Sequence, residues 1–243
     1  MRWSIRLGRL LGVPVYLHLT FLLLLGWIAL SALFSQGLAA AIYGVITISA
    51  VFGCVLLHEF GHVLAARRYG IVTRDVTLWP IGGVAKLERM PSKPSQELVV
   101  ALAGPAVNIA IASVLFPLVL VTPYNLLLQL LVINVALAVF NMIPAFPMDG
   151  GRVLRALLAM RGNYLRATVW AATIGRGFAI LIGLIGLFGI PNIVGPRPVL
   201  ILIAFFVWSA GARELLAVRH AQQLGWQPAG TWTPPVTDSD WRN

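Results

Sequence analysis

The sequence is poor in charged residues and nearly free of cysteine. Only 11% of its 243 residues are charged, and just eight of them are acidic. Its single cysteine, Cys54, excludes an intramolecular disulfide framework and a multi-cysteine zinc or iron–sulfur cluster. The 18 basic residues are scattered between hydrophobic stretches. Because nucleic-acid binding uses a concentrated basic patch or tail, this distribution argues against a nucleic-acid partner.

Hydrophobic runs account for most of the chain. Hydrophobic residues make up 59% of the sequence, and the mean hydropathy is +0.87. A helix that crosses a bilayer needs about 20 apolar residues, and runs of this kind recur almost from end to end. The sequence therefore predicts one integral membrane domain over residues 1–220, followed by a flexible, polar and proline-rich tail over 221–243. Six membrane-spanning helices are predicted, at about 17–34, 41–66, 96–121, 126–143, 168–189 and 198–218.

A stretch between the second and third predicted spans is typical of β-structure instead. It reads IVTRDVTLWPIGGVAKLERM (71–90), with several β-branched residues and a central Gly82-Gly83 pair. This pattern predicts a hairpin that turns at the two glycines and lies at the membrane face. The predicted fold class is an all-α polytopic membrane protein with six transmembrane helices and a small membrane-associated β-hairpin or sheet.

The basic residues also predict the orientation of the chain. They precede the first span and follow the second, fourth and sixth, whereas the connections after the other three spans contain only Arg197. Loops rich in arginine and lysine stay on the cytoplasmic side. We therefore expect a multi-pass protein of the cell membrane with both termini in the cytoplasm. The first hydrophobic run resembles a signal peptide, but it is long and has no convincing cleavage site, so we expect it to be retained.

The segment HEFGH carries the strongest chemical signal. His58 and His62 are four residues apart, which on a helix directs both imidazoles toward one place. Two imidazoles in this arrangement are typical of a catalytic zinc site, which uses three protein ligands and leaves a position for water. Glu59, beside the pair, could take a proton from that water. Ionisable groups inside a hydrophobic span are costly, so a functional role is the default interpretation.

A third ligand should come from another span at a similar depth, and Asp149 is the candidate. It lies in FNMIPAFPMDGGRVLRA, where prolines and glycines forbid a continuous helix. The alternative is that Asp149 caps the helix that follows, and both roles could hold together. Asn141, at the end of the fourth span, could hydrogen-bond a substrate carbonyl or the developing oxyanion. Its alternative role is to cap a broken helix.

Together, the segments HEFGH, FNMIPAFPMDGG, PIGGVAKL and ALAGPAVN resemble the site-2 protease family of intramembrane zinc metalloproteases. The resemblance implies a six-span core that hydrolyses peptide bonds in or near the transmembrane segments of other membrane proteins, a process of regulated intramembrane proteolysis. It assigns His58, His62 and Asp149 to one Zn²⁺ per chain, Glu59 to catalysis and Asn141 to substrate contact. The expected partners are substrate helices, the lipid bilayer and possible regulatory membrane proteins.

The sequence also departs from some members of that family. It shows neither a PDZ-like insertion nor a C-terminal pair of CBS modules, so it resembles the compact branch. The residues leave two other functions open. A metal-ion transporter would use the same ligands, but it would not need Glu59 and should show polar residues along both halves of a pathway. A catalytically silent membrane scaffold would have no reason to keep the zinc motif.

Overall fold

The computed structural model describes residues 3–80, 82–89, 91, 93–122, 124–189 and 195–223. Most of the predicted polar tail, residues 224–243, lies outside this part. The chain divides into two compact units. The first comprises residues 1–91 with 99–142, and the second comprises 92–98 with 143–243.

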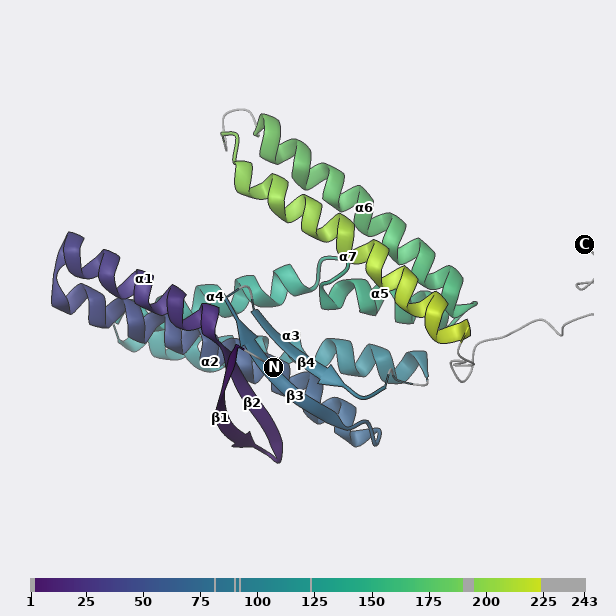
Figure 1. The fold of residues 1–243 in the computed structure, drawn as a ribbon, viewed down its shortest axis with the longest axis horizontal. Coiled ribbons are helices and arrows are strands. Elements are labelled where there is room, and N and C mark those ends of the chain that lie inside the picture. Colours follow the sequence, from purple (N-terminus) through teal and green to yellow (C-terminus); the bar gives the residue numbers. More distant parts are fainter. Residues whose placement is uncertain are drawn as a thin grey trace, which may run out of the picture. The chain divides into compact units, whose positions relative to one another are not determined.

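The first unit combines a small sheet with four helices (Figure 1). Its helix α3 begins in the second unit and continues into the first. In chain order the elements are β1 (Ser4–Leu10), β2 (Val13–His18), α1 (Leu19–Gln36), α2 (Leu38–Arg68), β3 (Thr73–Trp79), β4 (Gly82–Leu87), α3 (Pro94–Val121) and α4 (Asn125–Asn141).

The sheet has four strands in the order β1-β2-β3-β4. Strands β3 and β4 form the predicted antiparallel hairpin. The predicted turn position is wrong, however, because Gly82 and Gly83 are the first residues of β4 and pair with Trp79 and Leu78. Gly82 has φ +137°, which other residues rarely adopt. The glycine pair is thus needed at the start of the strand and not within the turn.

The other half of the sheet was not predicted from the sequence. Strands β1 and β2 form a second antiparallel hairpin, and β2 pairs in parallel with β3. Leu11 and Gly12 join β1 to β2, with φ values of 50° and 86°. Two successive positive φ angles are typical of a two-residue type I′ hairpin loop. Gly12 was the available signal, although leucine is an uncommon partner for it.

Among the described residues, five helices are long and apolar enough to cross a membrane: α1, α2 and α3 in the first unit, and two in the second. The fourth predicted span, at about 126–143, corresponds to α4, an apolar helix of 17 residues. At 1.5 Å per residue its length is about 26 Å, against about 30 Å for the hydrocarbon core of a bilayer. The structure therefore confirms a mostly helical membrane protein with five candidate spans. It does not confirm six, because α4 ends at Asn141, shortly before two prolines.

The second unit contains the other two spans, packed side by side (Figure 1). Helix α5 (Asp149–Ala159) is short, whereas α6 (Tyr164–Phe188) and α7 (Pro198–Gln223) are long. Glycines allow α6 to approach α7 closely: a Cβ atom at Gly186 would lie 3.0 Å from atoms of Ile201 and Leu200. In a membrane, where burial from water does not drive helix association, small residues of this kind permit close packing.

The predicted interruption before α5 is present. The chain between Asn141 and Asp149 is not helical, and Ala145 and Phe146 in this segment are buried. Two glycines make room for the segment. A Cβ atom at Gly151 would lie 2.7 Å from the backbone of Ala145, and one at Gly175 would lie 3.2 Å from Ala145 Cα. The segment that leads into Asp149 is therefore tightly packed within the second unit.

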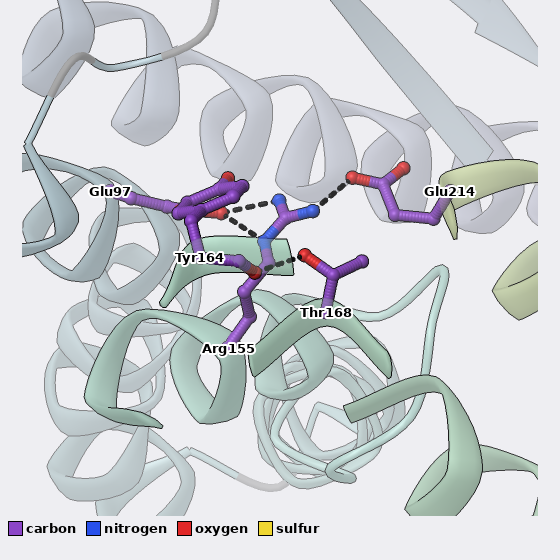
Figure 2. A network of polar contacts seen from close by, with 5 residues as sticks. All are labelled: Glu97, Arg155, Tyr164, Thr168 and Glu214. Carbon is purple, nitrogen blue, oxygen red and sulfur yellow. Dashed lines mark hydrogen bonds and ion pairs between the residues drawn. The ribbon is translucent and has the colours of Figure 1, made fainter. Parts of the chain in front are cut away.

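A buried network of charges holds the second unit together (Figure 2). Arg155 on α5 donates from Nε to Glu97 Oε1 at 2.8 Å, with a second bond from Nη2, and from Nη1 to Glu214 Oε1 at 2.6 Å. The hydroxyl of Tyr164 donates to Glu97 Oε2 at 2.8 Å. Burial by itself lowers the pKa of Arg155, but the attraction of Glu97 and its other neighbours outweighs this and raises the pKa. The guanidinium is therefore charged at every physiological pH.

Candidate metal centre

The two histidines of the HEFGH segment meet as their spacing predicts. Both lie on α2, and both are buried, with His58 6% and His62 7% exposed. Their Nε2 atoms are 3.2 Å apart. Two ring nitrogens at this separation can both act as ligands to one cation placed beside them.

The opposite ring nitrogens are held by oxygen atoms of α3. His62 Nδ1 lies 2.7 Å from the carbonyl oxygen of Val100, and His58 Nδ1 lies 2.5 Å from Asn108 Oδ1. A carbonyl oxygen only accepts hydrogen bonds, so His62 must carry its proton on Nδ1. Its Nε2 then keeps the lone pair that a metal ion requires.

A glycine of α3 leaves space beside both Nε2 atoms. A Cβ atom at Gly104 would lie 2.3 Å from His62 Nε2 and 2.7 Å from His58 Nε2. Since any other residue would occupy this space, Gly104 provides a cradle where a metal ion fits. Two imidazole nitrogens are ligands that zinc prefers, so the residues present fit a zinc site.

We expect Gly104→Ala to weaken zinc binding by at least about 10–100-fold, the range seen when the surroundings of metal ligands are altered. The atoms in the way are the ends of two side chains, so the imidazoles can turn aside and the helices need not move. Thermal stability should therefore change little while zinc affinity falls. Competition with a chelator measures the affinity, and melting in detergent measures the stability.

Two glycines of the neighbouring helix α2 serve as controls for this prediction. Gly53 has no atom within 4 Å of an added Cβ, so Gly53→Ala should leave both properties unchanged. An added Cβ at Gly61 would lie 2.6 Å from the backbone oxygen of Ala103, so Gly61→Ala should mainly lower stability. If Gly104→Ala binds zinc as tightly as Gly53→Ala does, the cradle interpretation is wrong.

Glu59 lies next to His58 and contacts the sheet. Its Oε2 accepts a hydrogen bond of 3.1 Å from the backbone N–H of Ala85 on β4. A Cβ atom at Gly83 would lie 2.5 Å from Glu59 Cγ, so the second glycine of the pair makes room for this side chain. Strand β4 thereby positions the carboxylate for which the sequence predicts the role of base.

Of the remaining candidates, Asp149 belongs to the second unit and Asn141 to the first. Asp149 is the first residue of α5 and is buried, with 7% of its surface exposed. The cap position belongs to Met148, so the alternative that Asp149 caps this helix is wrong. Asn141 is the last residue of α4, and its Nδ2 donates to the carbonyl oxygen of Leu137 at 3.0 Å. This bond joins Asn141 to its own helix, whose C-cap is Met142.

Two buried polar residues connected to His58 were not singled out in the sequence. Asn108 on α3 and Asn134 on α4 are both fully buried and hydrogen-bonded to each other, and Asn108 also contacts His58. The signal was present, because each is an amide within an otherwise apolar run. Polar side chains in such runs are costly and call for a partner.

Comparison with known proteins identifies a family. The model of Peptidase family M50 matches residues 46–126 and 121–184. A zinc metalloprotease from Methanocaldococcus jannaschii is 38% identical over 88% of this chain and 61% of its own length. Rip3 of Mycobacterium tuberculosis is 32% identical over 100% of this chain and 67% of its own length.

A solved structure gives the same result. The site-2 protease from Methanocaldococcus jannaschii matches with a TM-score of 0.63 and 37% identity, covering 88% of this chain and 95% of that one. The chain spans about three fifths of the first two curated relatives, 61% and 62% of their lengths. The family model, the sequence relatives and the solved structure all point the same way, and this chain belongs to the M50 family of peptidases, the site-2 protease family.

Proposed function

We propose that this chain is a zinc-dependent protease that hydrolyses peptide bonds in or near the transmembrane segments of other membrane proteins, as in regulated intramembrane proteolysis. The observation that carries the proposal is the pair of buried Nε2 atoms on α2, 3.2 Å apart, with Glu59 adjacent. A pair of metal ligands beside a carboxylate, inside a helix apolar enough to span a membrane, suits hydrolysis within the bilayer.

In this proposal His58, His62 and Asp149 hold one zinc ion per chain. Two imidazoles and one carboxylate form a ligand set typical of catalytic zinc in proteases. Zinc bound there would supply a Lewis acid that polarises the scissile carbonyl and makes a water molecule more acidic. The tight packing of the segment before Asp149 supports this role, because a metal ligand must be held in place.

Proton transfer and substrate binding are carried out by the protein's own side chains. Glu59 takes a proton from the attacking water and later gives it to the departing amine. The N–H of Ala85 holds the carboxylate of Glu59 in position for this transfer. Asn141 would exchange its bond to the Leu137 carbonyl for one to the substrate carbonyl.

The proposed setting is a six-span core formed by residues 1–220, in which α4 is the fourth span, and a cytoplasmic tail formed by residues 221–243. The distribution of basic residues supports cytoplasmic termini. Substrate helices and regulatory membrane proteins are the proposed partners, and the bilayer surrounds the apolar helices.

Zinc removal tests the proposal. We expect the purified chain in lipid vesicles to cleave at least one member of a panel of labelled single-span membrane proteins. Cleavage should fall to background after treatment with a chelator and return when zinc, but not magnesium, is added. Gel analysis of the labelled fragments and metal analysis of the protein give the two readouts.

Two results would contradict the proposal. Cleavage that persists in protein shown to be free of zinc would exclude a zinc mechanism. Stoichiometric zinc, together with zinc movement across the vesicle membrane and an intact substrate panel, would indicate the transporter instead.

A further inference from the structure

Three helices of the first unit share a chain of buried hydrogen bonds that ends at His58. Asn108 of α3 lies between His58 of α2 and Asn134 of α4, and both amide residues are 0% exposed. Asn134 in turn reaches the carbonyl oxygen of Leu130 at 2.8 Å and the sulfur of Cys54 at 3.3 Å. The bonds of Asn108 to His58 and to Asn134, and that of Asn134 to Cys54, are buried, and the bond to Leu130 is partly buried.

Which atom donates and which accepts in this series of hydrogen bonds is determined at the end farthest from His58. The carbonyl oxygen of Leu130 can only accept, so the group of Asn134 that faces it must be the NH₂. The same NH₂ faces Cys54 Sγ, a weak acceptor. Asn134 Oδ1 is therefore the atom that faces Asn108.

The orientation of Asn134 in turn determines which nitrogen of His58 carries the proton. Because Asn134 Oδ1 accepts, Asn108 must present its NH₂ to it, and this bond is 2.9 Å long. Asn108 Oδ1 is left to face His58 Nδ1, at 2.5 Å. An oxygen acceptor in that position requires a proton on Nδ1, so the lone pair of the neutral ring is on Nε2.

We propose that Asn108 and Asn134 are positioning residues that fix the tautomer of His58 so that its Nε2 is available to zinc. The inference rests on the proposed zinc site. His62 reaches the same tautomer by a shorter route, through the backbone oxygen of Val100. The tautomer of His62 is thus determined directly by a main-chain carbonyl. The tautomer of His58 is determined through two side-chain amides, the second of which is oriented by the carbonyl of Leu130.

The first test needs no variant and no zinc. Nitrogen NMR of ¹⁵N-histidine in the zinc-free wild-type protein distinguishes a protonated ring nitrogen from an unprotonated one. His58 and His62 should both be protonated on Nδ1, the nitrogen that faces an oxygen acceptor. A His58 ring without a proton on Nδ1 would overturn the proposal outright.

The second test breaks the chain at Asn134. In Asn134→Leu, Asn108 loses the acceptor that orients it, and its amide can turn to present NH₂ to His58. We expect a mixture of tautomers at His58, an unchanged tautomer at His62, and zinc affinity lower by about 10–100-fold. If Asn134 had a purely structural role, its loss would not change the tautomer of His58 while leaving the tautomer of His62 unchanged.

A conservative variant and a matched control complete the test. In Asn134→Asp, a protonated carboxyl can donate to Leu130 and accept from Asn108, so the tautomer of His58 and most of the zinc affinity should be restored. Gln129→Leu removes an exposed amide on the same helix and should change neither. If Asn134→Leu keeps the His58 tautomer and zinc affinity of the wild type, the proposed positioning role of Asn108 and Asn134 is wrong. Because the tautomer is measured without zinc or substrate, this result is separate from the failure of the proposed protease activity.

Discussion

Glu59→Gln is expected to lower the rate of substrate cleavage by about 10²–10⁴-fold, the usual contribution of a general base. Glutamine is nearly the same size as glutamate, and its carbonyl oxygen can still accept the N–H of Ala85, so the position of the side chain should be kept. Only the ability to take a proton is lost. Zinc content and melting temperature should therefore equal those of the wild type, and fragment formation over time gives the rate.

The matched control for this prediction is Glu88→Gln. Glu88 is an exposed carboxylate that pairs with Arg74 at 3.6 Å, and the same chemical change there should leave cleavage unaffected. If Glu59→Gln retains more than a tenth of the wild-type rate with full zinc content, Glu59 is not the base. If it loses zinc as well, the side chain is needed to build the site and its catalytic role must be measured in another variant.

Arg155→Met is expected to destabilise the protein by about 3–5 kcal/mol, the cost typical of removing one member of a buried ion pair. Arg155 and Glu97 are each 3% exposed, and the change leaves Glu97 and Glu214 without their shared cation. It also removes the guanidinium that lies 5.1 Å from the ring centre of Phe146, in the segment leading to Asp149. Denaturant titration in mixed micelles measures the loss of unfolding free energy.

The same network predicts a recovery. Replacing all three charged members, in Arg155→Met with Glu97→Gln and Glu214→Gln, should regain most of the lost stability, because no buried charge is then left unbalanced. Arg161→Met, at an exposed position just after α5, should cost little. A cost for Arg155→Met no greater than that for Arg161→Met would show that the network contributes nothing to stability.

Several elements of the fold and site could be predicted because they depend on local spacing. A four-residue interval brings His58 and His62 together on any helix, and two prolines before Asp149 interrupt any helix. The β3–β4 hairpin followed from its β-branched residues, although the predicted turn was misplaced. Gly82 is needed because its φ is positive, and Gly83 is needed because Glu59 lies close to it. A sequence pattern cannot distinguish these two requirements from the need for glycine in a turn.

Other elements depend on contacts between segments that are far apart in the chain. Strand β2 pairs with β3 across the whole of α1 and α2, and Asn108 meets His58 across 50 positions. Composition gave little guidance, because helices surrounded by lipid are apolar on every side. Without an alternation of polar and apolar faces, the sequence does not indicate which face of a helix meets its neighbour.

The sequence by itself determined that this is a helical membrane protein with a histidine pair and a carboxylate in one apolar helix. It also determined that the helix before Asp149 must be interrupted, because prolines and glycines forbid a continuous helix there. Only the tertiary structure decided that Gly104 leaves room beside both imidazoles, that two buried amides orient one of them, and that Arg155 balances Glu97 and Glu214. The physical reason is that helix periodicity acts within a few residues, whereas a hydrogen-bond partner or a close approach depends on which helices pack together.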